Sequence, residues 1–466
     1  MIDTRTTQPM RTPQPKPAQP PPTAPTGHHG TDATHGVDGH HGTDDGRPRR
    51  ASEADPFTHQ ELVTAVERVL ERHLNDRVGE AARIDPVFAE HMAARLADFV
   101  LRGGKRLRAG FVWWGWQAAG GEDNQAEAAL HIGAALELLQ GCALIHDDVM
   151  DASPVRRGAP AVHTDFTAVH ARARLHGSST AYGTTAAVLC GDLALTWADD
   201  LASATALSCT HGSRLHQEWR ALRTELIAGQ YLDVHGQANR STDLAQAVRI
   251  AGLKSGLYTV ERPLALGAAL AGADEATTSA LRSAGRCAGI AFQLRDDLLG
   301  VYGETAVTGK PSGDDLRDAK PTYLRALAVQ RAVAAGDHQA VRALTRAPHP
   351  ASPHPASPDP VPSDSPLSDS APFDEGELDA LRDVIERTGA RSAVEEQIER
   401  LVELSVRHLH AIPRAPHTPH TIDALTRLIE RAAAAPTGPP PTADRRAAPA
   451  RPTNDSRPAA TDGGRP

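Results

Sequence analysis

The sequence has few cysteines, and none is spaced for a metal site or a disulfide framework. Its 466 residues contain four, Cys142, Cys190, Cys209 and Cys287, all among apolar or small neighbours and without a C-x-x-C pair. This pattern argues against zinc ligands and favours buried, reduced thiols. We therefore expect a cytoplasmic location.

Long apolar runs and blocks of like charge are also missing. No uninterrupted apolar stretch approaches the roughly 18 residues needed to span a bilayer, and MIDTRTTQPM has no basic start followed by an apolar segment. The net charge of -9 is spread along the chain instead of gathered in runs. The sequence therefore predicts a soluble protein with no membrane span and no nucleic-acid partner.

Proline is scarce in the middle of the chain and concentrated outside it. Only seven of the 36 prolines fall between residues 56 and 345. Residues 1–55 are rich in proline, histidine and glycine and poor in large apolar side chains, which predicts a disordered tail. Pro/Ser/Asp-rich residues 347–372 predict a disordered insertion, and Pro/Ala-rich residues 432–466 a second tail. Helical patterning resumes between these two, so residues 56–431 are expected to form one interrupted domain.

This domain has the pattern of helices. Thr58 and Glu61 have the spacing of a capping box, and aliphatic residues then recur three and four apart. Residues 127–151 lack proline and are apolar on nearly every side, as in a helix at the centre of a bundle. Alternating strand patterns are absent from the sequence, so the fold class is predicted to be all-α. Further helices are expected at 185–207, 214–235 and 276–302.

The central apolar helix ends in an acidic cluster, HDDVMD. Asp147 and Asp151 are four residues apart and project from one helical face, with Asp148 beside them. Because these charges repel, a cation is needed to hold them together, and oxygen ligands suit Mg²⁺. An isolated D-D-x-x-D can also be a solvated helix end. Arg156 and Arg157 follow closely, however, and their fork-shaped donors suit phosphate, so the combination indicates a metal–diphosphate site.

A second acidic pair, Asp296 and Asp297, ends another apolar stretch, GIAFQLRDDLLG, with Gln293 one turn earlier. Alone, such a pair is ordinary surface chemistry. Together with the first cluster, it predicts two acidic walls facing one cavity. Three glycine-containing basic segments could each grip a phosphate or be surface turns: LRGGKRLRAG, LKSGLYTVERP and TGKPSGDDLRDAKPT.

These motifs resemble those of the trans-isoprenyl diphosphate synthases, or polyprenyl synthetases, and most of all the geranylgeranyl diphosphate synthases. LIHDDVMDASPVRRG and GIAFQLRDDLLG match the family's two acidic motifs in the family's order, within about residues 60–345 and less clearly 374–430. The resemblance implies an isoprenoid-synthase-type bundle around a central prenyl cavity. It also implies a homodimer that joins isopentenyl diphosphate to an allylic diphosphate (dimethylallyl, geranyl or farnesyl), with two or three Mg²⁺ ions bridging the diphosphate.

The resemblance assigns a role to each matching residue. The implied magnesium ligands and catalytic acids are Asp147, Asp148, Asp151, Asp296 and Asp297. The implied allylic diphosphate ligands are Arg156, Lys254, Ser255, Gln293, Lys310 and Lys320, of which Lys254 is also expected to be catalytic. The implied isopentenyl diphosphate ligands are Lys105, Arg108, Gln140 and Arg157.

Three positions depart from the family pattern. Gln140 stands where many relatives have histidine, although its amide can still donate to phosphate. Ser255 replaces the usual threonine and keeps the hydroxyl group. Gly300 occupies the fifth position of the second motif, where aspartate is common. Metal binding by that motif is therefore expected to depend on Asp296 and Asp297.

Product length is expected to be set below the first cluster, where Cys142 and Ala143 are small. Relatives that stop at fifteen carbons resemble this chain but have an aromatic residue there. A twenty-carbon product, geranylgeranyl diphosphate, is therefore expected, with Leu139 one turn further down as the floor. Close helix packing is the alternative explanation for the small residues. A farnesyl or longer-chain synthase, a class I terpene cyclase and a non-catalytic prenyl-diphosphate-binding subunit remain alternatives.

Overall fold

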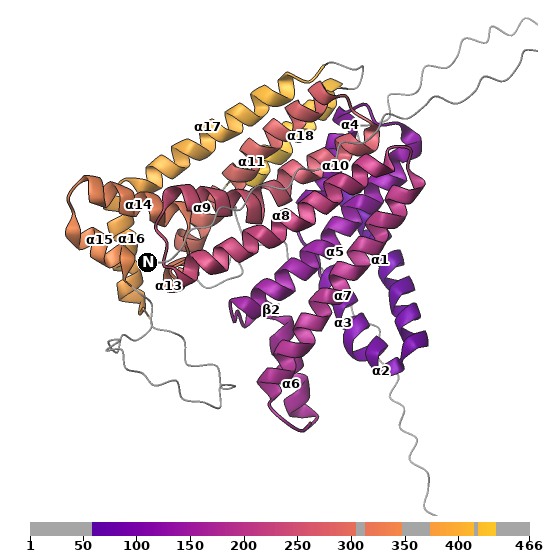
Figure 1. Ribbon diagram of the computed structural model, residues 1–466, viewed down its shortest axis with the longest axis horizontal. Coiled ribbons are helices and arrows are strands. Elements are labelled where there is room, and N and C mark those ends of the chain that lie inside the picture. The colour runs from indigo at the N-terminus through magenta and orange to yellow at the C-terminus, as the bar shows by residue number, and fades with distance from the viewer. Residues whose placement is uncertain (1–57, 304–312, 347–372, 414–417, 435–466) are drawn as a thin grey trace, which may run out of the picture. The chain divides into compact units, whose positions relative to one another are not determined.

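The computed structural model describes residues 58–303, 313–346, 373–413 and 418–434 (Figure 1). The regions expected to be disordered at 1–55 and 347–372 lie outside these residues, as does 435–466. The last described helix, α18 (Thr418–Ala433), continues two residues past position 431, where the folded domain was expected to end.

The described chain is helical almost throughout, which confirms the all-α prediction. Three of the described helical elements are not α-helices: η1 and η3 are π-helical and η2 is a 3-10 turn. In chain order the elements before α18 are α1 (His59–Ile84), α2 (Pro86–Phe88), η1 (Ala89–Ala93), α3 (Ala94–Leu101), α4 (Leu107–Ala118), η2 (Asp123–Gln125), α5 (Ala126–Met150), β1 (Val155–Arg156), β2 (Ala159–Pro160), α6 (Val162–Arg172), α7 (Ser179–Ser208), α8 (Gly212–Ala238), α9 (Leu244–Ile250), η3 (Ala251–Glu261), α10 (Arg262–Ala271), α11 (Glu275–Tyr302), α13 (Asp314–Arg317), α14 (Tyr323–Ala334), α15 (His338–Thr345), α16 (Glu375–Arg387) and α17 (Ala390–His410).

Helix ends follow from the capping residues. Thr58 Oγ1 accepts from Glu61 N at 3.2 Å, and Glu61 Oε2 accepts from Thr58 N at 2.7 Å, so the expected capping box begins α1. The helices expected at 127–151, 214–235 and 276–302 correspond to α5, α8 and α11. The helix expected at 185–207 is α7, which starts earlier because the Ser178 side chain accepts from the backbone N–H of Ala181.

The β1–β2 hairpin was not predicted from the sequence. Val155 pairs with Pro160 and Arg156 with Ala159 in antiparallel register. Two residues per strand are too few to show an alternating pattern. The hairpin nevertheless carries the basic residues that follow the first acidic cluster.

Helix α5 lies within the bundle, with α1, α4 and α7 packed against it (Figure 1). Its buried residues fall on all sides and include Ile132, Leu136 and Leu139. Among the described residues, Asp123–Met150 is the one helical segment long and apolar enough to cross a membrane by length and composition, although Glu137 interrupts it. Within its most apolar window 67% is buried, as in the core helix of a bundle.

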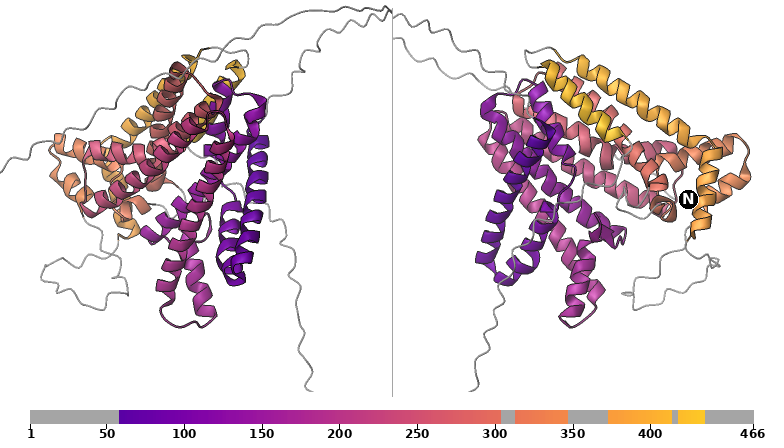
Figure 2. Two further views of the ribbon diagram at one scale, coloured as in Figure 1. Left: turned by 45° about the vertical axis from the view of Figure 1, so that its right-hand side comes forward. Right: turned by 180° about the vertical axis from the view of Figure 1, so that it is seen from behind.

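Helix α11 contributes to two apolar cores. The larger core is formed mainly by α1, η1, α3 to α8, η3, α10, the first half of α11 and α18. The smaller core packs the second half of α11 against α14, α15, α16 and α17. Helix α17 lies along α11, as the views in Figures 1 and 2 show. The chain after residue 373 therefore packs on the helix that carries the second acidic pair.

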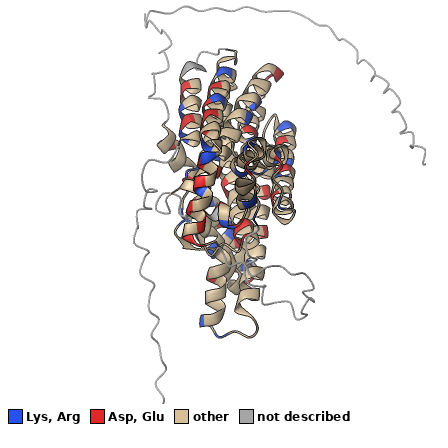
Figure 3. Ribbon diagram, turned by 90° about the vertical axis from the view of Figure 1, so that its left-hand side faces the viewer, with Lys and Arg blue, Asp and Glu red and all other residues tan. Residues whose placement is uncertain are grey.

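Acidic and basic residues alternate along the helices of the ribbon (Figure 3). Some of these charged residues form a network of ion pairs at the end of η3. Arg262 bonds Glu225 and, at 2.5 Å, Glu218 on α8, while Arg286 on α11 donates to buried Glu261 at 2.9 Å. Because buried charges are stable only when paired, this network fixes η3 between α8 and α11.

Candidate active site

The first acidic cluster lies at the C-terminal end of α5, as predicted. Asp147 and Asp148 are in the last turn of the helix, and Asp151 is its C-terminal capping residue. Asp148 is fully buried, and the other two are partly buried. The negative end of the helix dipole adds to the repulsion among three carboxylates. The cluster therefore requires cations around it.

Arg156 on the β1–β2 hairpin supplies the first cation. Its Nε donates to Asp148 Oδ1 at 2.7 Å and its Nη2 to Asp147 Oδ2 at 3.2 Å, with a further bond from Nη2 to Asp148. Burial opposes the charged guanidinium, but the two aspartates outweigh burial and raise the Arg156 pKa. The hairpin thus places Arg156 as the counter-ion of both adjacent carboxylates.

Lys254 on η3 is the second cation. Its Nζ donates to Asp147 Oδ1 at 3.2 Å and to Asp233 Oδ2 at 2.6 Å. Burial opposes its charge, but Asp147 and Asp233 together raise the Lys254 pKa. Lys254 therefore stays protonated in a largely buried position beside the cluster.

Two residues of this group, Gln230 and Asp233 on α8, were missed from the sequence. Gln230 Nε2 donates to Asp147 Oδ1 at 3.3 Å, and Asp233 is buried against Lys254. They are three residues apart on one helical face, so G-Q-x-x-D in a helical segment was the available signal.

Lys320 is the third cation, and it lies in a segment that contacts both acidic motifs. Its Nζ donates to Asp151 Oδ2 at 2.9 Å and lies 3.8 Å from Asp315 Oδ1. Three residues later, Tyr323 N donates to Asp297 Oδ2 at 3.1 Å. One four-residue segment therefore contacts both motifs, and the charged Lys320 is stabilised enough by Asp315 and Asp151 to overcome burial and raise its pKa.

The two carboxylates of the second pair have different surroundings. Asp297 is buried and accepts from Gln293 Nε2 at 2.7 Å as well as from Tyr323 N. Burial, aided by Asp315 and Asp296, raises its pKa to about 8 against the effect of these two donors. Asp296, in contrast, is exposed. Asp296 thus offers a carboxylate to solvent, whereas Asp297 is held by protein donors.

A separate basic group lies at the start of α4. Arg108 Nη2 donates to Thr259 Oγ1 at 3.0 Å, and its guanidinium lies 4.3 Å from the Tyr258 ring centroid. Lys105 is exposed just before this helix. Arg157 donates to the Gly103 carbonyl oxygen, and burial together with Arg106 lowers the Arg157 pKa. The fork-shaped donors of Arg108 and Arg157 and the ammonium group of Lys105 are suited to binding a phosphate.

Arg106 and Glu137 form a buried pair under this basic group that sequence reasoning missed. Arg106 Nη1 donates to Glu137 Oε2 at 3.0 Å, and Nη2 donates to the Val100 carbonyl oxygen at 2.9 Å. Arg106 has a left-handed backbone, with φ of 47°, at the N-cap of α4. Glu137 is the one acid in the middle of α5, away from both ends of the helix, and it was the signal for this pair, because a buried charge needs a partner.

Gln140, Ser255 and Lys310 complete the set of predicted diphosphate ligands. Gln140 is half-buried on α5, and within the described part of the chain its Oε1 has no hydrogen-bond partner. Ser255 is half-buried and follows Lys254 on η3. Lys310 lies outside the described residues.

The predicted chain-length residues lie below the first cluster on α5. Cys142 Sγ is 3.7 Å from His146 Nδ1, and His146 Nε2 bonds the Val188 carbonyl oxygen of α7 at 3.1 Å. Burial raises the pKa of the Cys142 thiol to about 12, so it stays protonated. Leu139 is buried and Ala143 is half-buried. The tail path along these residues remains a prediction.

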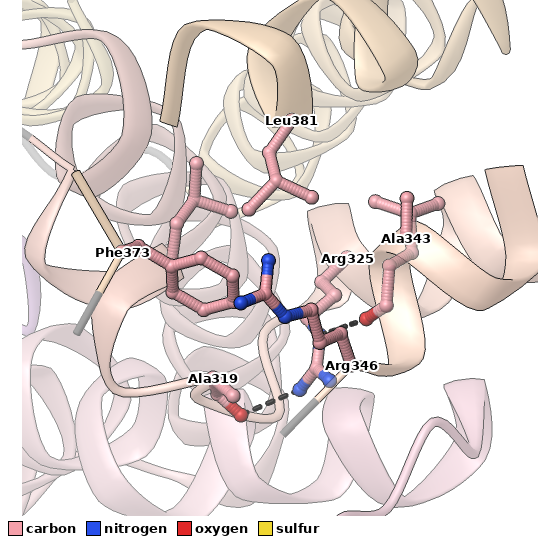
Figure 4. Close-up of a pocket in the computed structure, with 8 residues that line it drawn as sticks. Ala319, Arg325, Ala343, Arg346, Phe373 and Leu381 are labelled. Atoms are coloured by element: carbon pink, nitrogen blue, oxygen red, sulfur yellow. Dashed lines mark hydrogen bonds between the residues drawn. The ribbon is translucent and has the colours of Figure 1, made fainter. Parts of the chain in front are cut away.

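The small cavity in Figure 4 is separate from this site. It has a volume of about 10 Å³ and lies among Leu316, Arg325, Arg346 and Phe373. Arg325 fills one side, donating to the carbonyl oxygens of Ala319 and, at 2.9 Å, Leu344. A space of this size holds at most about one water molecule, so it cannot receive a prenyl chain.

The acidic clusters fit a metal that is shared with a ligand. Over the described ranges, no three His, Cys, Asp or Glu side chains are gathered closely enough to hold a metal by themselves. Arg156, Lys254 and Lys320 instead bond the carboxylates of the first cluster. Carboxylate oxygens are nevertheless the donors that Mg²⁺ prefers, and Mg²⁺ commonly completes its shell with water and substrate phosphate. The donor chemistry therefore fits Mg²⁺ held together with a diphosphate.

An all-α bundle with carboxylates on a core helix and on α11 has the isoprenoid synthase fold. Residues 90–352 match the polyprenyl synthetase family model. The chain belongs to the polyprenyl synthetase family and is a trans-prenyltransferase.

Individual relatives agree with this assignment. A geranylfarnesyl diphosphate synthase of Aeropyrum pernix is 32% identical over 249 residues, which cover 52% of this chain and 72% of that protein. A geranylgeranyl diphosphate synthase of Mycobacterium tuberculosis is 33% identical over 219 residues, which cover 47% of this chain and 57% of that protein. The crystal structure of a geranylgeranyl pyrophosphate synthase from Corynebacterium glutamicum, complexed with isoprenyl diphosphate and magnesium, has a TM-score of 0.71 and 34% identity, covering 81% of this chain and 99% of that chain.

Proposed function

We propose that this chain condenses isopentenyl diphosphate with dimethylallyl, geranyl or farnesyl diphosphate, in the presence of Mg²⁺, to give a longer all-trans prenyl diphosphate for isoprenoid biosynthesis. The observation that carries the proposal is the convergence of Lys254 and Lys320 on Asp147 and Asp151. These cations and carboxylates come from distant segments and are held in a largely buried group. A diphosphate with its metal ions has the complementary charges for both.

The proposed metal ligands are Asp147, Asp148, Asp151, Asp296 and Asp297. Bound Mg²⁺ supplies positive charge that stabilises the negative charge developing on the departing diphosphate. Asp148 accepts a hydrogen bond from Arg156, and Asp297 accepts one from Gln293. These two buried carboxylates therefore have protein donors of their own. Asp147, Asp151 and Asp296 are the less enclosed carboxylates of the two motifs.

The chain's cations have a proposed second task when substrate binds. Arg156, Lys254 and Lys320 donate to carboxylates in the structure, and they are proposed to donate to the oxygens of the allylic diphosphate as well. Fixed donors of this kind stabilise a leaving diphosphate without reorganisation during the reaction. The apolar core beneath α5 excludes water from the carbon chain, which protects the allylic cation.

Isopentenyl diphosphate is proposed to bind at Lys105, Arg108 and Arg157, near Gln140. The exposed Lys105 and Arg157 and the half-buried Arg108 concentrate positive charge outside the carboxylate cluster. The two proposed diphosphate sites differ in composition. The allylic site combines cations with carboxylates that bind metal, whereas the isopentenyl site consists of cations, so each diphosphate has its own site. The double bond then attacks the allylic cation, and the released proton passes to the departing diphosphate.

We propose geranylgeranyl diphosphate as the product. Small Cys142 and Ala143 support a chain longer than fifteen carbons, and so does the similarity to synthases named for geranylgeranyl and geranylfarnesyl products. A homodimer in the cytoplasm is the proposed working form. The free state of Cys142, Cys190, Cys209 and Cys287 supports a reducing compartment.

The proposal is tested by incubating the purified chain with labelled isopentenyl diphosphate and each of the three allylic primers. Labelled twenty-carbon product is expected with Mg²⁺, and chelation should abolish it until Mg²⁺ is restored. A terpene cyclase would convert an unlabelled prenyl diphosphate to a hydrocarbon and incorporate no label. A non-catalytic subunit would form no product, and either result would reject the proposal.

Variants connect this assay to the site. Asp147→Asn and Asp151→Asn should each lower turnover by about 100-fold or more, since they remove charge that the metal requires. Asp76→Asn changes an exposed acid on α1 and is the matched control. Equal activity of all three variants would remove the first cluster from the mechanism. Light scattering on the wild-type protein checks the dimer.

A further inference from the structure

Gly300 leaves a space on α11 that a side chain from another element fills. It follows Asp296 by four residues, so the two positions share one helical face. A Cβ atom on Gly300 would lie 1.9 Å from Asp315 Oδ2 and 2.6 Å from Asp315 Cγ. No side chain at position 300 can coexist with this placement. The carboxylate of Asp315 therefore occupies the volume where a residue-300 side chain would begin.

The backbone around Asp315 holds it against α11. Asp315 lies in the short helix α13, and its carbonyl oxygen accepts from Lys320 N at 3.0 Å. The preceding Gly313 has φ of 80°, a left-handed conformation that favours glycine and turns the chain into α13. The Asp315 side chain is half-buried. Its position thus comes from the fold of this segment.

Lys320 connects Asp315 with the first acidic cluster. Its Nζ is 2.9 Å from Asp151 Oδ2 but 3.8 Å from Asp315 Oδ1. The first distance is a hydrogen bond, and the second is an ion pair without one. Lys320 therefore places the Asp315 carboxylate within the same charged group as Asp151, while its directed bond goes to Asp151.

We propose that Asp315 supplies to the second acidic motif the carboxylate that Gly300 lacks, so that the α11 wall presents Asp296 and Asp315 toward the bound metal. The proposal rests on the proposed function, because it concerns the metal of that reaction. It makes Gly300 and Asp315 interdependent. Any side chain at position 300 displaces the Asp315 carboxylate, and an aspartate at position 300 can replace it only when Asp315 is removed.

The test measures how much Mg²⁺ strengthens the binding of inorganic pyrophosphate to the full chain, by calorimetry with and without the metal. Asp315→Asn should reduce this gain by about tenfold or more, as should Gly300→Ala, whose Cβ displaces the carboxylate. The double variant Gly300→Asp/Asp315→Gly should recover the gain to within about threefold of wild type. Asp318→Asn removes an exposed acid just after α13 and should change nothing. Circular dichroism verifies that each variant is folded.

The outcomes separate this proposal from the one on which it rests. A wild-type gain that Asp315→Asn or Gly300→Ala retains in full would overturn the role of Asp315 and leave the proposed function standing. The same holds if the double variant binds no better than Asp315→Asn. A wild-type chain whose affinity for pyrophosphate does not respond to Mg²⁺ would overturn both proposals.

Discussion

The ammonium nitrogen of Lys320 lies 2.9 Å from Asp151 Oδ2, although the two residues are 169 positions apart in the sequence. Both side chains are largely buried, so neither charge is stable without the other. The bond links the segment after α11 to the end of α5. It means that the surroundings of the two acidic motifs are coupled by the protein before any ligand binds.

Replacing Lys320 with methionine should weaken binding of the allylic diphosphate. The variant loses a charged donor, so we expect the KM for the allylic primer to rise about 10- to 100-fold. Lys105→Met is the counterpart and should raise the KM for isopentenyl diphosphate instead. Initial rates at varied concentrations of each substrate distinguish the two effects. If both variants raised the same KM, the division into two diphosphate sites would be wrong.

Gly229 should not tolerate a side chain. A Cβ there would lie 2.3 Å from the backbone nitrogen of Lys254, and a backbone atom cannot rotate away. Gly229→Ala should separate α8 from η3, destabilise the fold by about 1–3 kcal/mol and impair the contacts of Lys254. Gly252→Ala, on η3 two residues before Lys254, is the control, because a Cβ there meets none of the described residues within 4 Å. Denaturant unfolding and turnover measure both effects, and equal behaviour of the two variants contradicts the prediction.

Arg106 should act on isopentenyl diphosphate binding through Glu137. Arg106→Met leaves Glu137 buried without its main cation, which costs about 3–5 kcal/mol of folding free energy. In protein that remains folded, we expect a higher KM for isopentenyl diphosphate and an unchanged KM for the allylic primer. Arg102→Met removes an exposed arginine nearby and is the control. An equal increase in both KM values would indicate general loss of structure instead.

Asp297 should make stability depend on pH in the metal-free protein. Its folded-state pKa is raised to about 8, chiefly by burial, so the folded state binds more protons than the unfolded state between about pH 4 and 8. The free energy of unfolding should therefore fall as pH rises through this window, by at most about 1.4 kcal/mol per pH unit. Asp297→Asn should flatten that slope in urea unfolding from pH 5 to 8. Asp296→Asn, at the exposed neighbour, should keep the wild-type slope, and a wild-type slope in Asp297→Asn would contradict this account.

Ala143→Phe should shorten the product. A ring one turn below Asp147 would block a tail that runs down α5, since one isoprene unit spans about one helical turn of roughly 5.4 Å. Leu139→Ala should have the opposite effect and lengthen the product, while Ala143→Gly should leave it unchanged. Chromatography of the dephosphorylated products measures chain length. An unchanged product from Ala143→Phe would mean that the tail does not pass this residue.

The sequence predicted those parts of the fold and site that depend on local spacing. The helical period places Asp147 and Asp151 on one face, and the length of the apolar run indicates a core helix, which α5 is. The nearby Arg156 could be linked to the cluster because only a short turn separates them. Each of these relations is contained within a few turns of chain.

Relations between distant helices could not be obtained in this way. Asp233 is as ordinary in sequence as any helical aspartate, and its importance arises only because α8 lies against η3. The π-helical geometry of η3 also depends on tertiary contact, since Gly229 and Gly289 allow neighbouring backbones to approach it. No single-sequence period reports which helices will be neighbours.

The chain on either side of residues 347–372 is held together by direct contacts. Arg346 lies beside the Phe373 ring (Figure 4). Its guanidinium is 5.0 Å from the ring centroid, and its Nη1 is 2.5 Å from Glu377 Oε1. Loop-closure entropy grows only with the logarithm of loop length, so the length of the connection has little effect on this join. Opening the polypeptide within residues 347–372 and joining the two ends of the chain by a linker should therefore change the order of the helices along the chain and leave their packing the same.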